Sequence, residues 1–227
     1  MSQQLYASLP MYSNPASGAD PEVLWRALQS CFLTCGLNQT PDSLANDMAQ
    51  DKLWRSSSLL FSQTCGYPLM HGLKDHVRLV ATPVYDLPEK SHPDRASYYS
   101  YLVVARDRQV SLSDHHESLK IAFNGADSHS GMNALRYMLA KQNKEPASYA
   151  FIKSGAHKNT VDLIARGKAD LGAVDAVTYH LLEGDAYHNL SNLKIIGRSP
   201  EAPALPFITS TTTSDDSLMR MRDALNI

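Results

Sequence analysis

Short apolar segments alternate with amphipathic segments along this 227-residue chain, and this alternation limits the folds open to it. Runs such as 58–62 are typical of buried strands, whereas 21–35 carries apolar residues at helical spacing behind Asp20 and Pro21, a favoured helix start. Strands that alternate with helices indicate an α/β protein with largely parallel sheets. The predicted strands cover 5–9, 58–62, 77–85, 98–106, 121–124, 149–155, 169–175, 193–197 and 205–210. The predicted helices cover 21–35, 42–54, 131–142, 157–167, 176–183 and 215–225.

The composition is ordinary for a globular protein, with 43% hydrophobic residues, 19% charged residues and a net charge of −2. Proteins that bind nucleic acid usually show a basic excess, so we expect no nucleic-acid partner. The chain contains no run of about 18 apolar residues, which a membrane helix needs. Its three cysteines, Cys31, Cys35 and Cys65, form no Cys-x-x-Cys pair and favour buried thiols over a disulfide framework.

The N-terminal stretch MSQQLYASLPMYSNP has neither the basic region nor the apolar region of a secretory signal. The sequence as it stands therefore predicts a cytoplasmic protein, or a periplasmic one if a signal has been removed.

Polar turns follow four of the predicted strands. In α/β sheets, ligands bind where loops leave the carboxyl ends of strands, so four such turns together predict a polar cleft. The turns are Ser62-Gln63-Thr64-Cys65-Gly66-Tyr67, Ser128-His129-Ser130-Gly131, Ser154-Gly155-Ala156-His157 and Asp175.

Four stretches of the chain, in this order, resemble the phosphate and phosphonate substrate-binding proteins of ABC importers. They are YYSYLVVARD, IAFNGADSHSGMNALRYML, SGAHKNTVDLIARGKADLGAVDAVTYHLL and SPEAPALPFITS. The resemblance covers nearly the whole chain and is strongest over 98–210. Ser-x-Ser-Gly at a helix start is a weak motif alone, and it becomes specific together with Ser-Gly-x-His and Gly-Lys-x-Asp-x-Gly-x-x-Asp. The chain departs from the family in its short length, its lack of a signal and its His129, where small hydroxylated residues are common.

The resemblance implies a two-lobed fold of the type II periplasmic-binding-protein kind, with a two-segment hinge and a ligand cleft between α/β lobes. The polar, proline-containing segments 86–97 and 198–206 are the best candidates for the two crossings. We therefore predict one lobe from 1–97 with 198–227, and a second lobe from 98–197.

The resemblance also implies which residues contact the ligand. Tyr99 is preferred over Tyr98 because the family's tyrosine directly precedes the serine at position 100, and neighbouring strand residues face opposite sides. His157 falls close to the hinge and cleft, and Asp175 falls where the family has a cleft carboxylate. The full predicted set is Ser62, Gln63, Thr64, Tyr67, Tyr99, Ser128, His129, Ser130, Gly131, His157 and Asp175.

Each of these residues also has a structural interpretation. Ser128, Ser130 and Asp175 are good helix N-caps, and 62–67 reads equally as a polar surface turn. Donors at a helix start can nevertheless hold an oxyanion, since each hydrogen bond to a charged group contributes roughly 1.5–3 kcal/mol. Micromolar binding needs about 8 kcal/mol, so three or four such donors supply most of it.

Two other kinds of site are rejected. His115, His116 and Glu117 are consecutive, so they cannot all face one ion, and no partner group stands at the usual spacing. The Ser-His-Ser-Gly turn lacks the Gly-x-Ser-x-Gly elbow of serine hydrolases. We therefore predict no metal, no cofactor and no catalytic residue.

The sequence thus predicts a monomeric solute-binding protein that captures phosphate or a phosphonate-like oxyanion, as the substrate-binding component of an ABC importer and a partner of its permease. Closure of the lobes would follow binding by a population shift. Two alternatives stay open. One is a cytoplasmic sensor that passes ligand occupancy to a protein partner, and the other is an enzyme on the same fold in which His129 or His157 acts on a small substrate.

Overall fold

The computed structural model describes residues 4–110, 119–142, 149–185 and 190–226. Its internal contacts divide the chain into two compact units. Unit 1 comprises Met1–Pro83 and Ala204–Ile227, and unit 2 comprises Val84–Pro203. The predicted lobes differ from these units in 84–97 and 198–203, both of which belong to unit 2.

The sheet of unit 1 has the strand order β1-β2-β11-β3. β1 (Tyr6–Ser8) and β2 (Leu59–Gln63) pair in parallel, whereas β11 (Phe207–Ser210) is antiparallel to both β2 and β3 (Val77–Ala81). All residues of β2 are buried, which is typical of a strand covered on both faces.

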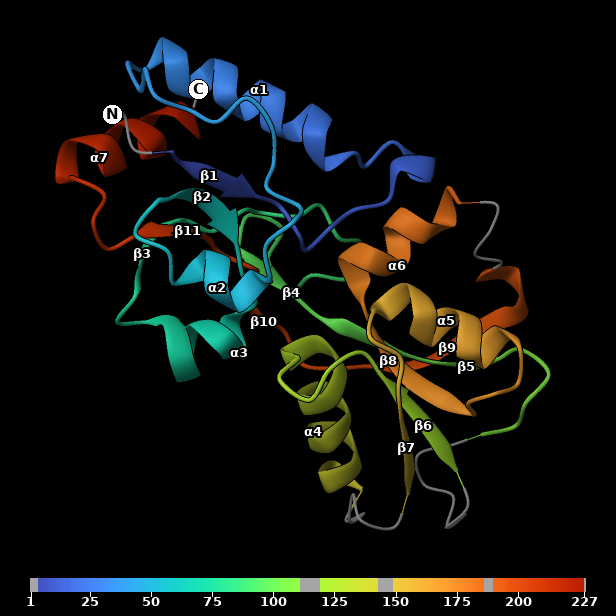
Figure 1. Cartoon of the computed structure of the whole chain (residues 1–227). Helices are drawn as coiled ribbons and strands as arrows, with labels where there is room; N and C mark the ends of the chain where they lie inside the picture. Colours follow the sequence, from blue (N-terminus) through green and yellow to red (C-terminus); the bar gives the residue numbers. More distant parts are fainter. Residues whose placement is uncertain (1–3, 111–118, 143–148, 186–189, 227) are drawn as a thin grey trace. The chain divides into compact units, whose positions relative to one another are not determined.

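Helices cover both faces of this sheet (Figure 1). On one face, α1 (Pro21–Thr34) and α7 (Asp215–Ala224) pack together over a core that includes Trp25 and Phe32. On the other face lie α2 (Gln50–Trp54) and a single π-helical turn, η2 (Leu69–Leu73), which follows the short α3 (Gly66–Pro68). The start of α1 is as predicted, because Asp20 accepts a hydrogen bond from Glu22 N at 2.9 Å and Pro21 opens the helix.

The predicted helix over 42–54 is wrong in its first part, since α2 begins only at Gln50. The preceding residues instead pass the open edge of β1, where Ala45 N donates to Ala7 O at 2.8 Å. Leu44 is buried there and its N donates to Glu22 Oε1 at 3.2 Å. These tertiary contacts outweigh helix propensity, which is a weak preference.

The sheet of unit 2 has the strand order β7-β6-β8-β5-β9. β6 (Lys120–Phe123) is parallel to both β7 (Ala150–Lys153) and β8 (Leu171–Asp175). β5 (Ser100–Ala105) is antiparallel to both β8 and β9 (Leu193–Arg198). The prediction of largely parallel sheets is therefore wrong, since both sheets are mixed. An apolar run shows that a strand is buried and leaves its direction open. The strand that runs against the others is β5 in the sheet of unit 2 and β11 in the sheet of unit 1.

The start and the end of unit 2 pair with each other. β4 (Ser97–Tyr98) and β10 (Ala202–Pro203) form a short antiparallel ladder in which Tyr98 faces Ala202. This ladder holds Tyr98 directly ahead of β5, where the chain enters the main sheet of the unit.

Helices also cover both faces of the unit 2 sheet (Figure 1). α4 (Ala134–Lys141) packs over Leu102 and Ile121, whereas α5 (His157–Ala165) and α6 (Ala176–Glu183) lie on the opposite face. A Cβ added to Gly172 would lie 2.5 Å from Thr160 Cγ2, so glycine at this position lets α5 approach β8 closely.

Candidate functional site

The carboxyl ends of β6, β7 and β8 lie at one edge of the unit 2 sheet, because these three strands are parallel. β5 runs the opposite way and pairs Ser100 with Asp175, so its first residue reaches the same edge. Predicted site residues from several separate segments of the chain therefore meet at this edge, which is the candidate site of unit 2.

The turn after β6 leads directly into a helix. Ser128 caps this helix, because its Oγ accepts a hydrogen bond from Gly131 N at 3.0 Å. The first helical residues form a π-helical turn, η3 (His129–Asn133), which continues into α4. π-helical turns are rare in proteins, and those that occur often lie at functional sites.

The turn after β7 fixes the start of α5. Ser154 Oγ lies 2.7 Å from Thr160 Oγ1 and donates to Phe123 O at 3.1 Å. Gly155 has φ of 84°, a left-handed conformation that glycine adopts readily. These contacts place His157, the first residue of α5, beside the turn after β6.

Four polar side chains meet there. Ser130 Oγ lies 2.8 Å from His157 Nε2, and Asn124 Nδ2 lies 3.2 Å from the same nitrogen. Ser130 is buried, and its Oγ also lies 3.5 Å from Ser128 Oγ. We call Asn124, Ser128, Ser130 and His157 the serine–histidine cluster.

The histidine of this cluster is uncharged at neutral pH. Burial lowers the pKa of His157 to about 4, and the backbone of Ala173 opposes this shift. A neutral imidazole carries one N–H and one lone pair. His157 Nδ1 and Asn124 Oδ1 are buried and have no hydrogen-bond partner among the described residues. The cluster therefore offers neutral donors and acceptors and no positive charge from His157.

The two adjacent tyrosines of the sequence have different surroundings. The ring centroid of Tyr98 lies 6.4 Å from that of His129, and burial lowers the pKa of His129. The hydroxyl of Tyr99 instead accepts a hydrogen bond from Glu89 N at 3.3 Å and lies 3.1 Å from the Tyr101 hydroxyl. The structure thus brings Tyr98 to the turn after β6, and it does not bring Tyr99 there.

Asp175 ends β8 and caps α6. Its Oδ1 accepts hydrogen bonds from Val177 N at 2.8 Å and from Thr178 N at 3.2 Å, and the residue is 2% exposed. The structure therefore gives Asp175 a capping role, and its contact with a ligand stays a prediction.

The predicted residues of unit 1 lie at and after the carboxyl end of β2. Ser62 Oγ accepts a hydrogen bond from Trp54 Nε1 at 3.1 Å, and Gln63 Nε2 donates to Leu205 O at 3.0 Å. Both side chains are buried. These contacts tie the end of β2 to α2 and to the segment before β11.

The next two predicted residues of unit 1 continue this pattern. Thr64 is fully buried, and its N donates to Pro206 O at 3.1 Å. Tyr67 is half-buried, and its ring centroid lies 4.1 Å from that of His71. A ligand-binding role for these residues stays a prediction.

The sequence-based site set omitted Asn124 and passed over Tyr98. A signal for Asn124 was present, because it is the polar residue at the carboxyl end of the predicted strand 121–124, where ligand-contacting loops begin. The surroundings of Tyr98 depend on the ladder between β4 and β10, which local sequence does not specify.

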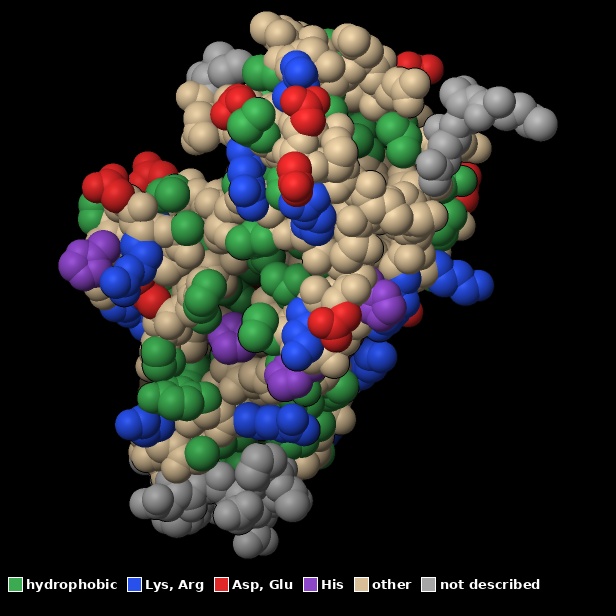
Figure 2. All heavy atoms as spheres, turned by 90° about the vertical axis from the view of Figure 1, so that its left-hand side faces the viewer, with side chains coloured by type: hydrophobic (Ala, Val, Ile, Leu, Met, Phe, Trp, Pro, Cys, Tyr) green, Lys and Arg blue, Asp and Glu red, His purple; other side chains and the backbone are tan. Residues whose placement is uncertain are grey.

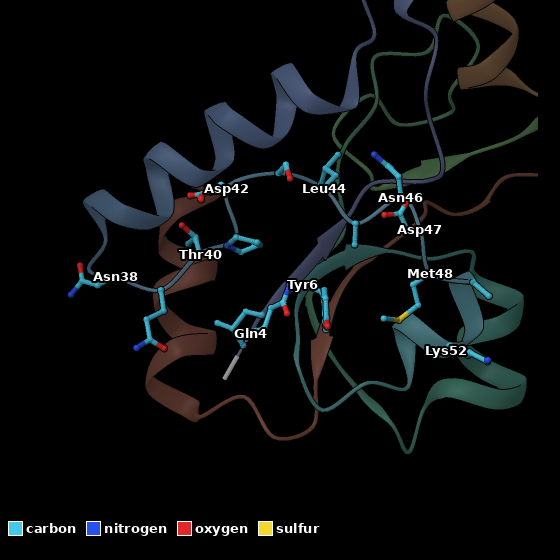
Figure 3. A pocket seen from close by; sticks show the side chains of 16 residues that line it. Gln4, Tyr6, Asn38, Thr40, Asp42, Leu44, Asn46, Asp47, Met48 and Lys52 are labelled. Atoms are coloured by element: carbon cyan, nitrogen blue, oxygen red, sulfur yellow. The ribbon is translucent and has the colours of Figure 1, made fainter. Parts of the chain in front are cut away.

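A hollow of about 990 Å³ lies elsewhere in unit 1 (Figure 3). The hollow is lined by segment 38–49 and by Gln4, Leu5, Tyr6 and Lys52. The polar side chains that Figure 3 labels there come from loop 38–49, from α2, and from the start of β1 and the residues just before it. None of the predicted site residues lines this hollow.

Charge and metal chemistry add little to the site. Within the described residues, no three His, Cys, Asp or Glu side chains are grouped to hold a metal ion. The triplet at 115–117 lies outside those residues. Acidic and basic side chains are interspersed on the face that Figure 2 shows. Among the helices in the described ranges, none is both long and apolar enough to cross a membrane.

Comparison with known proteins gives the family and the fold. A family model described as "ABC transporter, phosphonate, periplasmic substrate-binding protein" matches residues 58–226. No curated protein sequence matches the chain.

Three solved structures illustrate the likeness. A binding protein component of an ABC phosphonate transporter from Pseudomonas aeruginosa is 18% identical, with a TM-score of 0.69 over 98% of this chain and 74% of that one. PhnD1 from Prochlorococcus marinus, solved with methylphosphonate, is 16% identical, with a TM-score of 0.68 over 97% and 82%. XAC2383 from Xanthomonas citri, solved with ATP, is 16% identical, with a TM-score of 0.68 over 99% and 82%. These similarities confirm the predicted α/β fold of the type II periplasmic-binding-protein kind.

Proposed function

Because the chain belongs to the family of periplasmic substrate-binding proteins of ABC phosphonate transporters, we propose that it binds a small phosphonate or phosphate oxyanion as the substrate-binding component of an importer. Proteins of this family capture a solute and deliver it to a permease. The proposed partners are therefore a small anionic ligand and a permease.

The observation that supports this proposal most directly is the serine–histidine cluster at the start of η3. The first N–H groups of a helix have no intrahelical partner, and the helix dipole favours an anion there. The buried Ser130 hydroxyl lies beside those N–H groups. Three or four such donors, at roughly 1.5–3 kcal/mol each for a charged acceptor, approach the roughly 8 kcal/mol of micromolar binding without a Lys or Arg.

Isothermal titration calorimetry tests the proposal. We expect the purified protein to bind methylphosphonate or inorganic phosphate, and we expect Ser130→Ala to weaken that binding. Ser214→Ala is a matched control, because Ser214 caps α7 in unit 1 by accepting from Ser217 N at 3.1 Å. Absence of binding for both anions at millimolar concentration would contradict the proposal. Native mass spectrometry would then show whether another small molecule co-purifies.

A second candidate is hydrolysis, which the 2.8 Å separation of Ser130 Oγ and His157 Nε2 favours as a nucleophile–base pair. Two facts weigh against it. No carboxylate or other side chain orients the ring through Nδ1 among the described residues, and a base with a pKa of about 4 is weak at neutral pH. Phosphorus-31 NMR of a phosphonate monoester incubated with the protein separates the two functions, since only an enzyme releases product.

The predicted closure of two lobes on the ligand is a separate proposal. Small-angle scattering with and without saturating methylphosphonate tests it, because closure lowers the radius of gyration. A sensor would bind the same ligand, so only its association with a partner other than a permease separates it from an importer component.

A further inference from the structure

Asn124 contacts His157, yet neither the sequence nor the family description assigns it a role. It directly follows β6, and its amide nitrogen lies 3.2 Å from His157 Nε2. Its amide oxygen is buried and has no hydrogen-bond partner among the described residues. A buried polar atom without a partner carries a free-energy cost of about 1–3 kcal/mol, so its position requires an explanation.

The surroundings of Asn124 determine which way its amide faces. A Cβ added to Gly131 would lie 1.9 Å from Asn124 Oδ1, so a Cα–H of Gly131 is directed at this atom. Such a hydrogen suits an oxygen, as a weak C–H···O contact, and would collide with an NH₂ group. The reverse orientation would also bury unpaired N–H donors, which are rarer in proteins than unpaired carbonyl oxygens. The oxygen therefore faces Gly131 and the nitrogen faces His157.

This orientation fixes the tautomer of His157. The Asn124 NH₂ group can only donate, so the ring nitrogen that it faces must accept. Nε2 therefore carries the lone pair, and the single proton of the neutral ring lies on Nδ1. Ser130, at 2.8 Å from Nε2, then donates its hydroxyl hydrogen to the same lone pair in the unliganded protein.

Binding of an oxyanion changes the direction of the Ser130 hydroxyl. A charge-assisted bond is roughly twice as strong as a neutral one, so the hydroxyl hydrogen turns toward a bound oxyanion. Without Asn124 that turn would leave Nε2 buried and unpaired. When Asn124 is present, the lone pair of Nε2 still accepts a hydrogen bond from the Asn124 amide. The Ser130 hydroxyl can then turn toward the anion with little loss of free energy.

We propose that Asn124 is a positioning residue, which holds Nε2 of His157 as a hydrogen-bond acceptor and so frees the Ser130 hydroxyl to donate to an oxyanion. Its part in ligand binding rests on the proposed function above, whereas the tautomer of His157 does not.

The tautomer is measured by long-range ¹H–¹⁵N correlation of the imidazole in the ligand-free protein near pH 7. We expect a protonated Nδ1 and an unprotonated Nε2 in the wild type. We expect Asn124→Asp to reverse this, since a carboxylate only accepts and would draw the proton to Nε2. A protonated Nε2 in the wild type overturns the proposal, whether or not the protein binds a phosphonate.

Calorimetry with methylphosphonate and with inorganic phosphate measures the coupling. We expect Asn124→Ala to weaken binding about tenfold in the wild type, which corresponds to about 1.4 kcal/mol. In the Ser130→Ala background we expect the same change to weaken binding less than about twofold, because the residue acts through Ser130. Equal losses in both backgrounds overturn the coupling.

Asn159→Ala is the matched control. Asn159, like His157, lies in the first part of α5. Its side chain is exposed, and its amide donates a hydrogen bond to Ser154 O at 2.8 Å. We expect an unchanged His157 tautomer and unchanged affinity. If the wild type binds neither anion, the proposed function fails and the NMR result alone decides the role of Asn124. If Asn124→Ala does not fold, the nearly isosteric Asn124→Asp still reports the tautomer.

Discussion

Asp175 Oδ1 accepts a hydrogen bond from Val177 N at 2.8 Å, so this buried carboxylate ties the end of β8 to the first turn of α6. The first prediction follows from this bond. Asp175→Ala should lower the free energy of unfolding by about 1 kcal/mol, whereas Asp175→Asn should lower it much less, because asparagine is an equally favoured N-cap. Chemical denaturation measures both changes.

The same pair of variants tests a ligand role for Asp175. If its carboxylate pairs with the ammonium of an aminoalkyl phosphonate, Asp175→Asn should weaken binding of that ligand while methylphosphonate binding holds or improves. If the carboxylate accepts from a protonated phosphate, phosphate binding should weaken instead. Equal affinities for wild type and variant would leave Asp175 as a cap alone.

The second prediction separates Ser128 from Ser130. Ser128 Oγ accepts from Gly131 N, so Ser128→Ala should lower stability by about 1 kcal/mol through loss of a cap. Ser130 makes no such bond and faces His157, so Ser130→Ala should reduce anion affinity more than tenfold if one charge-assisted bond of roughly 1.5–3 kcal/mol is lost. Calorimetry and thermal melting on both variants measure the two effects. Equal loss of affinity in the two would contradict this division.

The third prediction concerns Gly131. An added Cβ would lie 1.9 Å from Asn124 Oδ1, so Gly131→Ala should lower the free energy of unfolding by about 1–3 kcal/mol through overpacking. Combining it with Asn124→Ala should restore much of this loss, because the second change removes the colliding atom. A double variant as unstable as the sum of the two single variants would show that the clash lies elsewhere.

Much of the fold could be predicted from local sequence. The start of α1 followed from Asp20 and Pro21, and α6 was predicted at 176–183 as the structure has it. Both are set by capping residues and apolar spacing within a few turns. The direction of β5 and the loop at 42–49 could not be predicted, because they depend on pairing with distant strands.

The candidate site, like the fold, could be predicted from the sequence only in part. The sequence identified the polar turns that meet at the carboxyl edge of the unit 2 sheet, because strand ends are visible as changes from apolar to polar residues. It did not indicate that Tyr98 rather than Tyr99 lies beside His129, since that depends on the β4–β10 ladder. The contact between Asn124 and His157 joins two turns that lie far apart in sequence.

The last prediction concerns pH. Burial lowers the pKa of His157 from 6.5 to about 4, so the unfolded chain binds a proton that the folded protein excludes. The stability that neutral His157 contributes is therefore complete above about pH 6.5 and is lost as the pH falls toward 4. One pKa unit corresponds to about 1.4 kcal/mol, so the wild type should lose about 2 kcal/mol between about pH 7.5 and about pH 5.

Two variants assign this loss to its source. His157→Gln should flatten the dependence in this window, whereas His129→Gln should remove only a lesser part, because burial also lowers the pKa of His129. Glu201, whose pKa is lowered from 4.5 to about 2 by its hydrogen bonds to Ser91 and Ser97, affects stability only at lower pH. Urea denaturation at both pH values measures the difference. A wild type whose stability is the same at both values would show that the folded protein protonates His157 as readily as the unfolded chain does, which would contradict the lowered pKa of His157.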